Sequence, residues 1–174
     1  MNKELRLRRC LLLCCHFARN LAYHRARRMV DLPPAADFWI SADGNFIDIA
    51  VLEWCKILGD DKAEQGWRKI VVEPDRFHAE LLVELGMEVD EWDALVQHIR
   101  LYRDKFLAHL DSDLHMNIPK LDQALRAAEF YYRWILEYEF GEFDRTVISP
   151  TLMSFYAERL AEAKSVYKAV SVRS

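Results

Sequence analysis

An arginine interrupts the apolar face of the fourth predicted helix. The face repeats at the spacing of three and four residues that is typical of an amphipathic helix. Its apolar members are Trp92, Val96, Ile99, Phe106 and Leu110. Position 103 falls in the same row but is Arg103, and an arginine is almost never fully buried without a partner. Either Arg103 pairs inside the protein, or this face lines a cleft or a second subunit.

Polar groups that transfer protons or bind anions crowd the end of this helix. Arg103, Asp104 and Lys105 are followed by His109. An imidazole titrates near neutrality, whereas a guanidinium stays charged and binds paired oxygens of a phosphate. Six residues at about 100° each place His109 about 240° around a regular helix from Arg103 and about 9 Å along its axis. Therefore the helix end bends, or the two groups serve a site built from two chains.

A simpler interpretation of the same residues needs no ligand. Arg103, Asp104 and Lys105 would form an ion-pair cluster on the surface, and His109 would only end the helix. Exposed ion pairs of this kind contribute little to stability. Spacing alone leaves this interpretation open.

The string YRDKFLAH, from Tyr102 to His109, resembles the signature of HEPN domains (higher eukaryotes and prokaryotes nucleotide-binding). That signature is an Arg, a polar residue directly after it, and a His a few residues later; here five residues stand between Arg103 and His109. Other stretches are similar to the abortive-infection, phage-resistance branch of this family. They are FIDIAVLEWCKIL at 46–58, YRDKFLAHLD at 102–111, IPKLDQAL at 118–125 and the Tyr131-Tyr132 pair.

The resemblance implies a metal-independent endoribonuclease of a phage-defence or toxin system, with no organic cofactor. Such enzymes typically act as homodimers whose motif helices meet across a two-fold axis. By this likeness Arg103 stabilises the transition state, His109 transfers a proton, and Asp104 orients them. Lys105 would bind a phosphate of the RNA. An antitoxin or another defence-system protein is a possible partner.

Asp104 departs from the family pattern, in which Asn is common at this position. Its carboxylate adds negative charge that opposes phosphate binding. The main alternative is therefore a non-catalytic HEPN-like module that binds RNA or a protein, and a further one is a structural helical subunit. A toxin silenced by nucleotidylation of a tyrosine two residues after the motif His is disfavoured, because Asp111 stands there.

The first predicted helix is strongly basic. Residues 1–30 hold eight Lys or Arg and one acid, on a chain whose formal net charge is −4. We predict that Arg19 and Arg25 contact the RNA backbone by charge. Arg19-Asn20, followed by His24, is a second match to the signature. Its place on the first helix is wrong for the family motif, so we interpret it as part of this basic face.

Periodicity predicts one all-α domain over residues 1–174, a HEPN-like bundle of about five to six helices. The basic helix is expected at about 3–29 and the motif helix at about 90–110. Residues 35–45 are expected to form a loop because Asp43-Gly44 is a turn signal. Gly59 and Gly86 are expected to cap the second and third helices. Residues 66–72 are ambiguous between helix and strand.

Several other patterns carry no function of their own. Trp54, Trp67, Trp92 and Trp134 are expected in the core. The four cysteines lack a CxxC pair, which favours free thiols in a reducing cytoplasm. No apolar run reaches the length of a membrane span. Asp111, Asp113 and His115 are interpreted as an acidic loop rather than a metal site.

Overall fold

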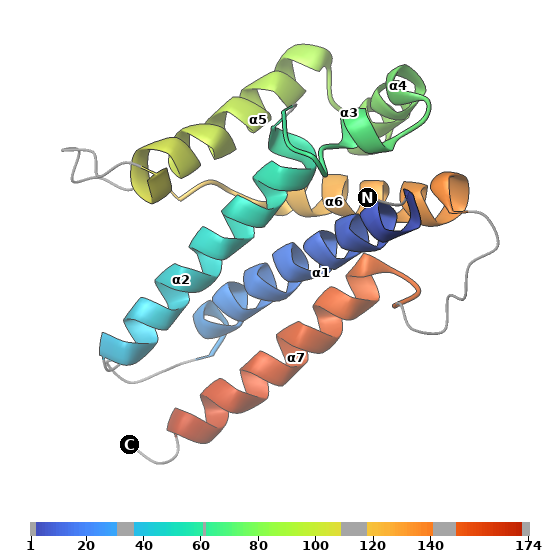
Figure 1. Cartoon of the computed structure of the whole chain (residues 1–174). Coiled ribbons are helices and arrows are strands. Elements are labelled where there is room, and N and C mark those ends of the chain that lie inside the picture. Colours follow the sequence, from blue (N-terminus) through green and yellow to red (C-terminus); the bar gives the residue numbers. More distant parts are fainter. Residues whose placement is uncertain (1–2, 31–36, 61, 109–117, 141–148, 172–174) are drawn as a thin grey trace.

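The structure is a computed structural model that describes residues 3–30, 37–60, 62–108, 118–140 and 149–171 (Figure 1). This part of the chain is helical and contains no strand. Its α-helices are α1 (Lys3–Arg28), α2 (Asp37–Trp54), α3 (Trp67–Ile70), α4 (Pro74–Leu85), α5 (Val89–Tyr102), α6 (Asp122–Trp134) and α7 (Leu152–Ser171). Three π-helical turns follow α2, α5 and α6: η1 (Cys55–Gly59), η2 (Arg103–Ala108) and η3 (Ile135–Glu139). The predicted all-α fold is confirmed.

Helix α1 is the central element of the bundle. It packs along α2 on one side and α7 on the other, while α5 crosses near the C-terminal end of α2 (Figure 1). Its core-facing residues are buried, and Cys14, Phe17 and Ala18 have no exposed surface. Helix α1 can pack against both α2 and α7 because its apolar residues recur on more than one face.

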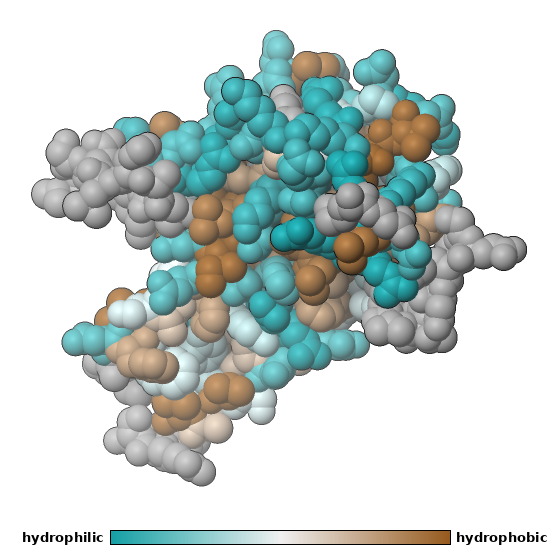
Figure 2. Space-filling model, in the orientation of Figure 1, coloured by the Kyte–Doolittle hydropathy of each residue, from teal (hydrophilic) through white to brown (hydrophobic). Residues whose placement is uncertain are grey.

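The predicted tryptophan core is confirmed. Trp54, Trp67, Trp92 and Trp134 are each at most 3% exposed. Phe77 of α4 joins them, with its ring centroid 5.1 Å from that of Trp67 and 5.2 Å from that of Trp134. On the face seen in Figure 2, hydrophilic residues cover most of the region over α5. The aromatic groups therefore serve packing between α2, α4, α5 and α6.

The loop predicted at residues 35–45 is wrong, because α2 already begins at Asp37. Asp43 would cap a turn if its carboxylate bonded to its own backbone. Instead that carboxylate is held by α1, with Oδ1 3.0 Å from Nδ1 of His24. Ring contacts add to this, since Trp39 packs on Tyr167 of α7 with centroids 5.7 Å apart. Tertiary contacts thus override the turn signal of Asp43-Gly44.

The two glycines predicted as helix caps behave differently. Gly86 follows α4 with φ of 66°, the left-handed conformation expected of a cap. Gly59 is not a cap of this kind, because Gly86 is the only glycine with positive φ in the described part of the chain. A Cβ at Gly59 would lie 3.0 Å from Cζ3 of Trp54. The small residue is required there by the packing of an indole ring.

Gly86→Ala and Gly44→Ala are expected to change stability in opposite directions. The left-handed backbone at Gly86 makes an alanine there unfavourable by about 1–2 kcal/mol. Gly44 lies inside α2 with nothing within 4 Å of an added Cβ, so alanine there should stabilise by about 0.5–1 kcal/mol. Urea denaturation of the two variants measures both effects. Equal shifts of the same sign would contradict the assigned backbone conformations.

His78 of α4 gives the fold a pH dependence. Its ring stacks on Trp67 at 5.4 Å, its Nε2 is buried without a hydrogen bond, and burial followed by the nearby Arg68 lowers its pKa below the ordinary 6.5. The unfolded chain therefore binds this proton more readily, and stability falls as pH drops below about 6.5. When the pH is lowered from about 7.5 to about 6, we expect the Tm of His78→Phe to decrease by less than the Tm of the wild type. An equal loss in both proteins would assign the dependence elsewhere.

Candidate functional site

A buried tyrosine fixes the end of α5 against α2. Tyr102 is 2% exposed, and its hydroxyl donates a hydrogen bond of 2.7 Å to Oδ1 of Asp48. Burial, together with the bond to the Asp48 carboxylate, raises the pKa of this hydroxyl well above its usual value. The phenol therefore stays protonated at neutral pH, so the donated hydrogen is retained. This contact fixes the end of α5, to which Arg103 is directly attached.

The motif helix expected at about 90–110 is α-helical from Val89 to Tyr102, and residues 109–110 lie outside the described residues. The chain continues as the π-helical turn η2 from Arg103 to Ala108. Turns of this kind are rare inside helices and are frequent at functional sites. The motif thus begins where the α-helical winding stops.

Arg103 is paired inside the protein, which is the first of the two possibilities raised by its place in an apolar row. Its side chain is 20% exposed. Nε donates to Oδ1 of Asp104 at 2.7 Å, and Nη1 lies 3.5 Å from Oδ2 of Asp60. The hydrogen bond to Asp104 is the main cause that raises the pKa of this guanidinium. A half-buried, permanently charged group is thereby held between two carboxylates.

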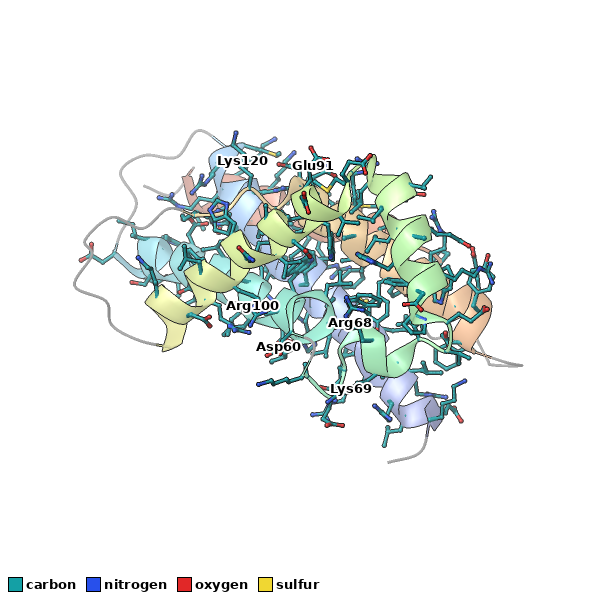
Figure 3. All side chains as sticks on the ribbon, turned by 90° about the horizontal axis from the view of Figure 1, so that it is seen from above. Asp60, Arg68, Lys69, Glu91, Arg100 and Lys120 are labelled. Carbon is teal, nitrogen blue, oxygen red and sulfur yellow. The ribbon has the colours of Figure 1, made fainter. Side chains whose placement is uncertain are left out.

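Asp60 is a member of this cluster that sequence analysis missed. It follows η1 and has an extended backbone, with φ of −132° and ψ of 109°. Figure 3 shows Asp60 beside the part of α5 that carries Arg100. The contact spans 43 positions of the sequence, and no spacing rule connects residues so far apart. Only the packing of η1 against α5 brings Asp60 to Arg103.

The thiol nearest to this cluster is not a nucleophile. Cys55 is 1% exposed, and burial raises its pKa to about 11, against a smaller opposite effect of Arg103. A reactive cysteine needs a depressed pKa and access to solvent. Together the four cysteines form no disulfide, so Cys55 acts as a small apolar residue.

Of the other motif residues, the structure describes Lys105 but not His109. Lys105 lies in η2 and is half-buried, directly after the exposed Asp104. His109 lies outside the described residues, as do Asp111, Asp113 and His115. The structure therefore brings Arg103 and Asp104 together and does not place the imidazole relative to them. In the described part of the chain no group of three His, Cys, Asp or Glu side chains is arranged to hold a metal.

The two arginines predicted to contact RNA lie on α1, and neither contacts Arg103. Arg19 is half-buried near His16, and burial followed by the charge of Arg19 lowers the pKa of that imidazole. Arg25 is 22% exposed and forms an ion pair of 2.7 Å with Asp122 at the start of α6. Arg25 is therefore engaged with the protein rather than part of a free basic face.

The second match to the signature is largely buried. Asn20 is 4% exposed and donates to the carbonyl of His16 at 2.7 Å. His24 is 5% exposed and pairs with Asp43. Asn20 is therefore explained by a hydrogen bond within α1, and His24 by its pairing with Asp43 of α2.

Comparison with known proteins adds no family to these observations. Searches against protein-family models, curated proteins and solved structures gave no match. None of the described helices combines the length and the apolar character that a membrane span requires.

Proposed function

We propose that this chain is a HEPN-like, metal-independent endoribonuclease of a phage-defence or toxin system. The observation that carries the proposal is the guanidinium of Arg103, held at the end of α5 by Asp104 and Asp60 at 2.7 and 3.5 Å. The likeness of residues 102–109 to the HEPN signature supports it, and so does the all-α bundle around them.

The two carboxylates leave part of the guanidinium for a ligand. Nε is used by Asp104 and Nη1 faces Asp60, whereas Nη2 makes no hydrogen bond with any residue that the structure describes. A guanidinium donates from several nitrogens in one plane, which matches the paired oxygens of a phosphate. An entering phosphate would compete for Nη1 with the longer contact to Asp60, while the short bond to Asp104 keeps the fork oriented.

The proposed reaction is cleavage by the RNA's own 2′-hydroxyl. His109 removes the 2′ proton as this oxygen forms a bond to the adjacent phosphorus, and the bond from phosphorus to the 5′ oxygen breaks. The leaving 5′ oxygen takes a proton from solvent water, and the protonated His109 afterwards releases its proton to solvent. The products are a 2′,3′-cyclic phosphate and a 5′-hydroxyl. Arg103 stabilises the negative charge that accumulates on the phosphate oxygens.

We expect the active form to be a homodimer in the cytoplasm. The angle of about 240° between Arg103 and His109 assumed a regular α-helix, whereas Arg103 to Ala108 form the π-helical turn η2. The expectation of a dimer is therefore supported by the resemblance to HEPN domains, whose motif helices typically meet across a two-fold axis. A two-fold interface brings both copies of the same segment together. If each site takes one residue from each chain, mixing inactive Arg103→Ala and His109→Ala proteins should restore part of the activity through mixed dimers. Failure to restore any would favour sites within single chains.

Purified protein on total RNA in the presence of EDTA tests the nuclease directly. The wild type should cleave, and His109→Ala should not. Intact RNA with the wild type, or equal cleavage by both proteins, would reject the proposal. Activity that disappears only with EDTA would reject the metal-independent mechanism.

A non-catalytic module that binds RNA or a protein is the second candidate. It is favoured by the engagement of Arg103 with two carboxylates, which reduces the positive charge offered to a phosphate. Expression in bacteria separates the two candidates. A nuclease should arrest growth in a manner that depends on both Arg103 and His109, unless a partner such as an antitoxin is present, whereas a binding module should not.

A further inference from the structure

A cavity of about 420 Å³ opens between the C-terminal part of α1, the middle of α2 and the segment that leads into α6. Its volume lies within the range of about 300–1,000 Å³ that is usual for small-molecule sites. Part of its wall is apolar and belongs to the core, since Leu21, Ile47 and Leu121 are each 2% exposed. Pro119 and the half-buried Ile118 extend this apolar wall.

Positive charge surrounds the opposite part of the cavity. Arg25, Arg28 and Lys120 line it, with Asp122 as the one carboxylate among the described lining residues. Arg25 is already engaged, because it donates to Asp122 at 2.7 Å and to the Tyr156 hydroxyl at 3.3 Å. This pair leaves an excess of positive charge that the lining itself does not neutralise.

Arg28 and Lys120 carry that excess. Both side chains are exposed, and neither forms an ion pair with any residue in the described ranges. They come from different elements, the last turn of α1 and the segment before α6. Two cations at one opening, neither paired with a carboxylate in the described part of the chain, are suited to bind an anion between them.

His24 adds a polar group to the wall. Its Nδ1 lies 3.0 Å from Oδ1 of Asp43, which fixes the ring. No residue that the structure describes bonds to Nε2, so this nitrogen remains for a polar atom of a ligand. An imidazole held by a carboxylate on one nitrogen presents the other in a defined direction.

We infer that this cavity binds a small phosphate monoester with a compact apolar body. Arg28 and Lys120 would hold the phosphate, and the apolar body would lie against Ile47 and Ile118. Inorganic phosphate alone would leave the apolar wall in contact with water, and an uncharged molecule would offer no negative charge to the two cations. Figure 3 shows Lys120 on the opposite side of α5 from Asp60, so this site is separate from the cluster around Arg103. The inference does not depend on nuclease activity.

Phenyl phosphate is the simplest probe that combines the two features. By isothermal titration calorimetry, it should bind saturably and at least about tenfold more tightly than phenol or inorganic phosphate. Arg28→Ala/Lys120→Ala should weaken binding of phenyl phosphate by about tenfold or more. The control Arg9→Ala/Lys62→Ala removes the same charge from exposed positions outside the cavity and should bind as the wild type does.

Three results would overturn this inference. The first is the absence of saturable binding of phenyl phosphate to a folded wild type. The second is equal weakening by the cavity variant and its charge-matched control, which would show a general effect of charge. The third is binding of a short RNA, but not of phenyl phosphate, through Arg28 and Lys120, which would assign the cavity to a nucleic-acid backbone.

Discussion

Arg103→Ala is expected to slow RNA cleavage by about 100-fold to 1,000-fold, the usual cost of removing one group that stabilises a developing oxyanion. The guanidinium is held by Asp104 and Asp60 beside the anchored Tyr102, so its loss cannot be compensated by a neighbouring side chain in the same position. Arg103→Lys keeps the charge but removes the planar fork. It should therefore recover only part of the rate.

Arg76→Ala is the matched control for this experiment. Arg76 of α4 also pairs with two carboxylates, Glu73 at 3.1 Å and Glu80 at 2.8 Å. It lies far along the chain from the motif and takes no part in the proposed site. The single-turnover cleavage rate should be unchanged in this variant. Equal slowing in the Arg76 and Arg103 variants would indicate a loss of structure rather than of chemistry.

Trp54→Ala is expected to have the largest effect on stability, a loss of about 3–5 kcal/mol. Trp54 has no exposed surface, and its ring packs on that of Trp92 with centroids 6.1 Å apart. Its Nε1 also donates to the carbonyl of Ala124 at 3.0 Å, which ties α2 to α6. The truncation would remove apolar contacts and leave that carbonyl without a donor.

Two further variants separate these contributions. Trp54→Phe keeps much of the ring but lacks the donor, so it should cost less, about 1–3 kcal/mol. Phe38→Ala removes an aromatic ring that is 70% exposed and should stay within about 0.5 kcal/mol of the wild type. Urea denaturation monitored by circular dichroism gives all three values. If Trp54→Ala lost less unfolding free energy than Phe38→Ala, the central position of Trp54 in the core would be contradicted.

The long helices were predictable because each carries a long apolar row, whereas the short α3 (Trp67–Ile70) lies in the segment left ambiguous between helix and strand. The expected basic helix at 3–29 is α1 at Lys3–Arg28, and the cap at Gly86 was found from residue type alone. The start of α2 was not predictable from local signals. Asp43-Gly44 has the composition of a turn. The helix continues through it because of contacts with distant residues, namely the pairing of Asp43 with His24 and the packing of Trp39 on Tyr167.

The candidate site was predictable in part. The break in the apolar row identified Arg103, and the adjacent Asp104 is its closest partner, at 2.7 Å. Asp60 was not found, because the ion pair depends on how η1 packs against α5. The cationic cavity was missed for the same reason, since Arg28 and Lys120 meet only when α1 and the segment before α6 fold together.

Analysis of the RNA ends tests most directly whether the held guanidinium of Arg103 serves phosphate chemistry. A defined RNA should be incubated in EDTA with the wild type or with Arg103→Ala, and the products analysed by mass spectrometry. The wild type should produce 2′,3′-cyclic phosphate and 5′-hydroxyl ends, which Arg103→Ala should not produce in the same time. Uncut RNA with the wild type, or identical products from both proteins at equal rates, would contradict the proposed role of Arg103.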